Sequence, residues 1–152
     1  MSHSSAAAPA TPVPPTTAEL MELFALASTA YFHDFTAVAA NQGLTSMQAK
    51  LLSLLRQPLS MRELAERLAC DASNITGIVD RLEARGLVRR EMRPDDRRVK
   101  NVVCTEAGTD AILRVRDEMR ATHQALAGLA DADRIVLADL LQRLRASLDQ
   151  RA

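Results

Sequence analysis

Residues 81–100 contain an unusual concentration of basic side chains for a chain of 152 residues whose formal net charge is zero. This window holds eight lysine or arginine residues and four acidic ones, which gives it a local net charge of +4. Lysine and arginine are the side chains that neutralise DNA phosphates. The position of the charges therefore indicates DNA binding at this part of the chain, although the net charge of the whole chain does not.

Polar side chains suited to reading base edges lie just before the basic window. Ser73, Asn74 and Thr76 fall in the N-terminal half of a predicted helix. Asparagine can form two hydrogen bonds with adenine, and a threonine methyl can contact the methyl group of thymine. Gly77 would let the backbone come close to DNA, and Arg81, one turn further on, would reach a phosphate.

Two short helices and a turn are predicted to position these side chains. Ser60 to Glu63 reads S-x-x-E, a capping box that opens the first helix. After a turn at residues 69–71, Asp71 can cap the second helix, and Gly86 lies where a C′ glycine belongs. The apolar face of the second helix is predicted to consist of Ile75, Ile78, Val79 and Leu82.

A charged hairpin follows these helices at once. Residues 87–92 and 99–104 alternate apolar and polar side chains, and residues 93–98 between them form a loop with a proline and two aspartates. The tip would bring Arg97 and Arg98 to the adjacent minor groove, where the potential of DNA is most negative. A helix-turn-helix alone is a weak signal and charged hairpins are often only solvated, but the two in this order predict a winged helix that binds DNA.

The rest of the chain is predicted to be mostly helical. Its composition, 47% hydrophobic but only 3% aromatic, favours packed helices in a mainly α (α+β) fold. Residues 1–16 are rich in Ser, Ala, Pro and Thr and are expected to be a disordered tail, or alternatively a docking arm. Further helices are expected over 17–40, from a capping box at Thr45–Gln48 to a stop at Pro58, from Thr105 to about 128, and from a cap at Asp131 onwards.

The helix over 17–40 is apolar over most of its circumference and needs more cover than one small domain usually supplies. An identical partner could bury this surface together with the Leu- and Ala-rich helix at 132–148, and a bundle within one chain is the alternative. We therefore expect one domain over 17–152, in which 17–44 and 106–152 are dimerisation helices. A winged-helix lobe with a two-stranded β-wing is expected at 45–105.

The motifs of the hairpin and its flanks resemble those of the MarR family of bacterial transcription regulators. The family pattern is D-x-R, five residues, then L-T-x-x-G. Asp96, Arg98, Thr105 and Gly108 match it, while Cys104 stands in place of the leucine. Residues 79–90, VDRLEARGLVRR, match equally well. The resemblance covers roughly 18–150 and implies a homodimer on a pseudo-palindromic operator, with Asp96 bracing Arg98 in the minor groove.

Proteins of this family often bind a small phenolic or amphipathic anion between the dimer helices and the DNA-binding lobe. The resemblance thus implies a repressor that such an effector relieves. The side chains expected to line the pocket can also be read as structural, since a histidine at a domain junction is often satisfied and aromatic residues four apart also suit core packing. The candidate lining residues are Tyr31, His33, Phe35, Met47 and Leu51.

Other classes of function find little support in the sequence. Cys70 and Cys104 have no CxxC spacing or nearby histidine pair, so no metal site, disulfide framework or cofactor is expected, and both are read as small apolar fillers. A thiol-responsive regulator and a protein-interaction module without DNA binding remain the alternatives. No local motif indicates an enzyme. We also find no membrane span or secretory signal, and we expect a cytoplasmic protein.

Overall fold

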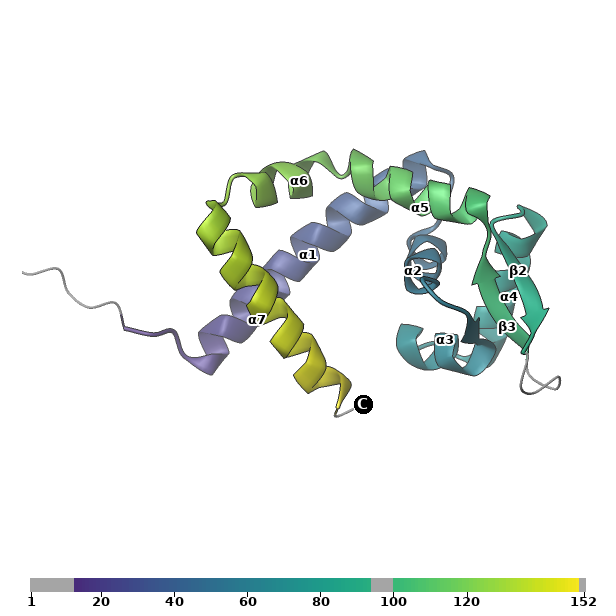
Figure 1. The fold of residues 1–152 in the computed structure, drawn as a ribbon, viewed down its shortest axis with the longest axis horizontal. Coiled ribbons are helices and arrows are strands. Elements are labelled where there is room, and N and C mark those ends of the chain that lie inside the picture. The colour runs from purple at the N-terminus through teal and green to yellow at the C-terminus, as the bar shows by residue number, and fades with distance from the viewer. Residues whose placement is uncertain (1–12, 94–99, 151–152) are drawn as a thin grey trace, which may run out of the picture.

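The computed structural model describes residues 13–93 and 100–150, which form seven helices and three strands. Figure 1 shows a central lobe of α2, α3, α4 and the sheet, with α1 and α5–α7 extending away from it. The elements are α1 (Thr17–Asn41), α2 (Ser46–Leu54), β1 (Leu59–Ser60), α3 (Met61–Leu68), α4 (Ala72–Ala84), β2 (Val88–Met92), β3 (Lys100–Cys104), α5 (Glu106–Glu118), α6 (Arg120–Ala127) and α7 (Asp131–Asp149).

The helices of the lobe begin where the predicted capping boxes lie. Thr45 and Ser60 each accept a hydrogen bond from the backbone N–H three residues later, and the Gln48 and Glu63 side chains accept from the cap backbone in return. Asp71 occupies the N-cap position of α4 as predicted, but its side chain makes no capping hydrogen bond. A third box, formed by Thr16 and Glu19, starts α1 and was not recognised in the sequence.

The sheet has three strands rather than the two predicted. Its order is β1-β3-β2, with antiparallel pairing throughout. Val88 pairs with Cys104 and Met92 with Lys100, as the predicted hairpin requires, while Leu59 pairs with Val102 on the other side of β3. A strand of two residues is too short to show alternation, so only the tertiary pairing reveals β1.

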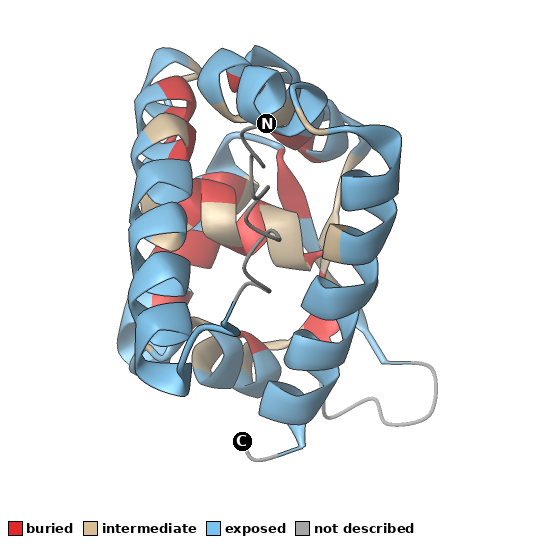
Figure 2. Cartoon of the chain, turned by 90° about the vertical axis from the view of Figure 1, so that its left-hand side faces the viewer, coloured by how far each residue is buried: buried red, intermediate tan, exposed pale blue. Residues whose placement is uncertain are grey.

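The hydrophobic core lies in the lobe and at its junction with α1 and α5. The apolar face predicted for α4 is buried completely or nearly so, with 0–3% exposure. In contrast, α6 and α7 bury no residue, and α1 buries three of its twenty-five. Figure 2 shows this difference, because the helices nearest the viewer are coloured almost entirely as exposed. The largest fully buried side chains are Leu51, Leu52, Leu59, Leu64, Ile75, Leu82, Val79, Val88, Val102 and Val115.

The single helix predicted from Thr105 to about residue 128 is interrupted at Met119. The backbone of Met119 leaves the helical region, with φ −71° and ψ 67°, and its side chain is 2% exposed. Burial of this side chain therefore accompanies the break. Asp34 of α1 then caps α6, accepting from the backbone N–H of Thr122 at 2.9 Å and from its hydroxyl at 2.7 Å. These bonds hold the pKa of Asp34 below its usual range.

The last helix also begins differently from the prediction. Ala130 is the N-cap of α7, and Asp131 is the first helical residue, so Asp131 does not cap the helix. An acidic side chain in the first turn still interacts favourably with the helix dipole. None of the helices within the described ranges is long and apolar enough to cross a membrane.

Candidate nucleic-acid interface

The helices α3 and α4 form a helix-turn-helix whose turn contains one residue with left-handed backbone. Ala69 has φ 49° and ends α3, and Asp71 starts α4 two residues later. The buried side of α4 packs into the lobe, so its other side faces solvent. Ser73, Asn74 and Thr76 are all exposed on this solvent side. The structure thus brings together the polar side chains that the sequence predicted for base contact.

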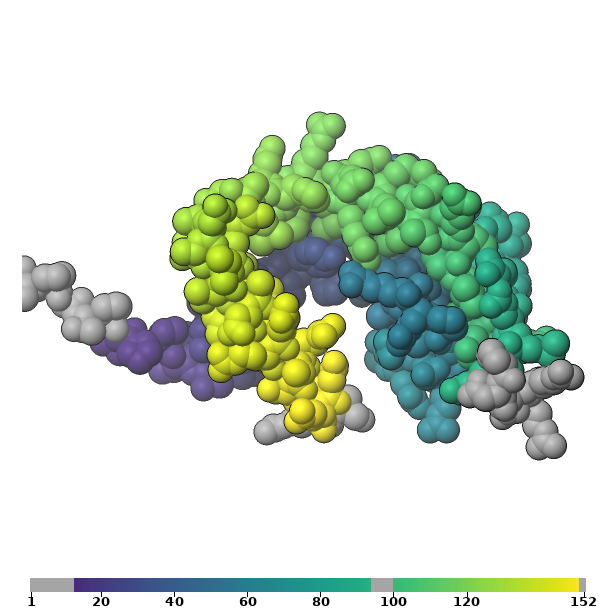
Figure 3. Space-filling model, viewed as in Figure 1, coloured from purple at the N-terminus to yellow at the C-terminus, as the bar shows by residue number. Residues whose placement is uncertain are grey.

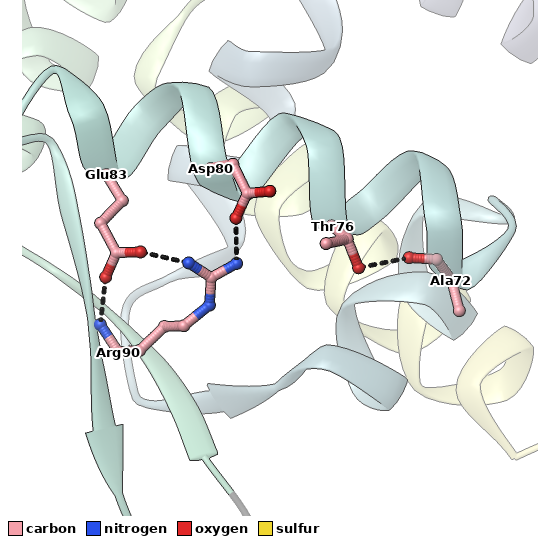
Figure 4. A network of polar contacts seen from close by, with 5 residues as sticks. All are labelled: Ala72, Thr76, Asp80, Glu83 and Arg90. Atoms are coloured by element: carbon pink, nitrogen blue, oxygen red, sulfur yellow. Dashed lines mark hydrogen bonds and ion pairs between the residues drawn. The ribbon is translucent and has the colours of Figure 1, made fainter.

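The geometry of Thr76 and Gly77 narrows what each can do. The Thr76 hydroxyl donates to the Ala72 carbonyl at 2.9 Å, which leaves its methyl group and an oxygen lone pair for other contacts (Figure 4). A Cβ on Gly77 would lie 3.8 Å from the Arg81 guanidinium and would meet nothing closer. The free chain therefore has room for a side chain at residue 77. Any requirement for glycine there would have to come from a partner.

Arg90 of β2 clamps the hairpin to α4, a contact that the sequence analysis missed. Its guanidinium donates to Asp80 at 2.6 Å and to Glu83, and its backbone N–H donates to Glu83 at 3.0 Å (Figure 4). The hydrogen bond from Arg90 to Asp80 raises the pKa of Arg90. Asp80 and Glu83 lie three residues apart and so share one face of α4, which was the available signal. Arg90 is therefore a structural residue of the wing.

The basic window is less available than its sequence suggests. Besides Arg90, Arg85 donates to the Gly43 carbonyl at 2.7 Å and Arg89 pairs with Glu91 at 2.5 Å. Arg81 and Lys100 are exposed and have no ion-pair partner among the described residues. The positive charge of the described part is thus concentrated at α4 and the start of β3. The predicted wing residues Asp96, Arg97 and Arg98 lie outside the described residues.

Thr105 and Gly108 join the wing to α5. The Thr105 hydroxyl donates to the Gly86 carbonyl at 2.7 Å and accepts from the Gly108 N–H at 3.1 Å, and the Thr105 N–H donates to the Leu87 carbonyl at 3.1 Å. A Cβ on Gly108 would lie 2.0 Å from the Leu87 oxygen and 2.8 Å from the Cys104 sulfur. The T-x-x-G motif is therefore a close contact between α5 and the end of α4.

A pocket of about 360 Å³ lies between α1, α2 and α3; we call it the α1–α2 pocket. Three of the predicted residues line it, namely Tyr31, Phe35 and Met47. The prediction was wrong for the other two, because Leu51 is fully buried in the core and His33 is exposed away from the lining. The lining residues that the sequence analysis missed are Phe32, Lys50, Ser53, Leu54, Arg67 and Leu68.

The chemistry of the α1–α2 pocket combines aromatic rings with cations. Tyr31 stacks on Phe35 with ring centroids 6.2 Å apart and meets Phe32 edge to face at 5.4 Å. The Lys50 ammonium lies 4.4 Å from the centroid of the Phe32 ring. Arg67 adds a second positive charge from α3. The pocket therefore offers apolar contact and positive charge, which suits a small organic anion.

The two cysteines are both half-buried. The Cys70 thiol donates to the Leu68 carbonyl at 3.3 Å. Burial raises the pKa of the Cys104 thiol, which lowers its thiolate fraction at neutral pH. Both observations fit the expectation that these residues fill space. Among the residues that the structure describes, no group of three His, Cys, Asp or Glu side chains could hold a metal ion.

The helix-turn-helix, the hairpin braced against it and the polar solvent face of α4 define a winged helix-turn-helix DNA-binding protein. Residues 44–100 match the model of the MarR family. The transcriptional repressor NicR of Pseudomonas putida is 34% identical over 115 residues, which span 72% of each chain. This chain belongs to the MarR family of DNA-binding transcription regulators, which are not enzymes.

Solved structures agree with this assignment. A MarR family protein from Bacillus stearothermophilus has a TM-score of 0.74 at 24% identity, over 87% of this chain and 94% of that one. CouR from Rhodococcus jostii RHA1, bound to p-coumaroyl-CoA, has a TM-score of 0.67 at 27% identity, over 83% of this chain and 91% of that one. The predicted mainly helical fold with a winged helix is thereby confirmed.

Proposed function

We propose that the protein is a homodimeric repressor that binds a pseudo-palindromic operator and is released by a small organic anion. The observation that carries the DNA-binding part is the two-sided character of α4. Ser73, Asn74 and Thr76 face solvent while the opposite side is buried in the lobe, so the helix can enter a major groove without losing core contacts.

The proposed roles of the DNA-contacting residues follow from this arrangement. Asn74 offers the bidentate contact to adenine, and Thr76 offers its methyl to thymine, since its hydroxyl hydrogen already bonds Ala72. Gly77 and Arg81 lie on the same exposed stretch, where Arg81 meets a phosphate. For the wing we propose that Arg97 and Arg98 contact the minor groove and that Asp96 orients Arg98, as the family motif implies.

The apolar surface of α1 and α7 supports the homodimer. The larger exposed hydrophobic side chains gather on these two helices, whereas a soluble monomer rarely exposes apolar patches of several hundred square ångströms. Figure 3 shows that α7 stands apart from the lobe across an open hollow, so the chain leaves its own α7 uncovered. The exposed side chains are Leu20, Met21, Leu23, Phe24, Leu26, Ile135, Val136, Leu140, Leu141, Leu144 and Leu148.

The α1–α2 pocket supports the effector. It lies where the dimerisation helix α1 meets the lobe, so a ligand there can favour one lobe spacing over another, to the extent of its differential affinity. Lys50 and Arg67 would meet the anion, and the aromatic cluster of α1 would hold its apolar body. NicR is named a repressor and CouR binds an aromatic thioester, and both precedents agree with the proposal.

A selection of genomic fragments followed by fluorescence anisotropy tests the DNA-binding part. We expect a fragment with two half-sites about one DNA turn apart. The logarithm of affinity should fall with that of salt by about 0.9 per phosphate neutralised. Arg98→Ala should weaken binding while the dimer stays folded, and Arg114→Ala, which alters an exposed arginine of α5, should not. No enriched fragment, or a flat salt response, would favour a protein-interaction module instead.

A further inference from the structure

A second hollow, of about 270 Å³, lies between α2 and α5 and reaches the end of β3. Ser53 lines both this hollow and the α1–α2 pocket, so the two sites lie on either side of α2. We call the second one the α2–α5 hollow. Its lining consists of Leu52, Ser53, Leu55, Arg56, Cys104, Thr109, Ile112, Leu113 and Arg116.

Two arginines from different helices line the α2–α5 hollow. Arg56 ends the α2 side and is exposed, and Arg116 lies on α5 and is half-buried. No ion pair joins either guanidinium to a described carboxylate. Two like charges that line one hollow without a counter-charge repel each other, and a bound anion would relieve this repulsion.

The rest of the lining selects what kind of anion fits. The hydroxyls of Ser53 and Thr109 already donate to the carbonyls of Ala49 and Thr105, at 2.9 and 3.0 Å, so neither has a hydrogen left for an anion. The arginines must therefore supply the donors. The leucine and isoleucine side chains of the lining offer apolar contact. We propose that the α2–α5 hollow is a second ligand site, which takes a small carboxylate with an apolar body.

The position of Cys104 connects this site to the wing. Cys104 ends β3, lines the hollow, and lies beside Gly108 at the contact between α5 and Leu87. A ligand in the hollow therefore touches the junction where the wing strand passes into α5. Its occupancy would be sensed there independently of the α1–α2 pocket.

Protection of Cys104 from alkylation tests the proposal. In the Cys70→Ser protein, we would measure the rate at which the neutral reagent N-ethylmaleimide modifies Cys104, with benzoate as the probe and benzyl alcohol as its uncharged counterpart. Benzoate should slow the reaction and benzyl alcohol should not. Arg56→Gln or Arg116→Gln should each raise the half-protecting benzoate concentration about fivefold, the effect of one exposed ion pair. The matched control Arg67→Gln, in the other pocket, should leave it unchanged.

Three results would overturn the proposal. These are no protection at concentrations that saturate the α1–α2 pocket, equal protection by benzyl alcohol, and loss of protection in Arg67→Gln. Amide chemical shifts provide a second measurement that does not depend on thiol reactivity. Benzoate should move the signals of Ser53, Thr109 and Arg116 in wild type, and Arg116→Gln should suppress the shift of Thr109. Unmoved signals would refute the site whether or not Cys104 reacts.

Discussion

Gly108 is the position where one methyl group should have a large effect. A Cβ there would lie 2.0 Å from the Leu87 oxygen and 2.9 Å from the Leu87 carbonyl carbon, so the two segments must separate by roughly 1 Å to restore normal contact. Leu87 cannot move freely, because its oxygen accepts a hydrogen bond from the Thr105 N–H. The substitution Gly108→Ala therefore strains the connection between the wing and α5.

The magnitude follows from three contributions. Overpacking costs about 1–3 kcal/mol, and loss of the hydrogen bond from Thr105 to Leu87 costs about 0.5–1.5 kcal/mol. Alanine regains about 0.8–1 kcal/mol, because glycine is unfavourable inside a helix. We expect Gly108→Ala to lower the free energy of unfolding by about 2 kcal/mol.

Urea unfolding followed by circular dichroism would measure this change, at one protein concentration because dimerisation contributes to stability. Gly77→Ala is the matched control, since it makes the same substitution in a helix where the new Cβ meets only the Arg81 side chain at 3.8 Å. It should stabilise the protein by about 0.5–1 kcal/mol. If Gly108→Ala proved as stable as wild type, the close-contact explanation of the T-x-x-G motif would be wrong.

Three further perturbations have defined outcomes. Arg90→Met should destabilise the protein by about 1–2 kcal/mol in urea unfolding, because it leaves two carboxylates of α4 without their shared partner; an unchanged midpoint would contradict the clamp. Asn74→Ala should reduce operator affinity by about 1–3 kcal/mol in anisotropy without changing the salt slope, and a changed slope would instead indicate a phosphate contact. Because its folded-state pKa is lowered, Asp34 should stabilise α6 above the ordinary aspartate pKa and lose this effect as pH falls through the lowered value. Amide exchange of α6 should show that loss in wild type and not in Asp34→Asn.

Most of the lobe could be predicted because its signals are local. The boxes at Thr45 and Ser60 and the glycine at residue 86, with φ +69°, all act within a few residues, and each marks a helix end in the structure. The apolar period of α4 likewise follows from helix geometry alone. The break at Met119 has no such signal, because it depends on the burial of Met119 and on Asp34, which lies 88 residues from its partner Thr122.

The candidate sites show the same division. The side chains of α4 were found because a helix presents them at a fixed period, and family membership was read from a motif of matching residues. The pocket was only partly predicted, since Lys50 and Arg67 come from two helices whose relative placement no local pattern encodes. Charge counting also overstated the basic surface, because it ignored the contacts of Arg85, Arg89 and Arg90.

The sequence by itself determined the order of the elements, the solvent face of α4 and the family, all of which rest on short-range periodicity and motifs. Only the tertiary structure decided the third strand, the broken helix and the clamp of Arg90. It also decided the lining of the two ligand sites. The physical reason is that these features depend on which side chains from distant segments are buried or paired together, and that outcome is settled by packing of the whole chain rather than by any stretch of it.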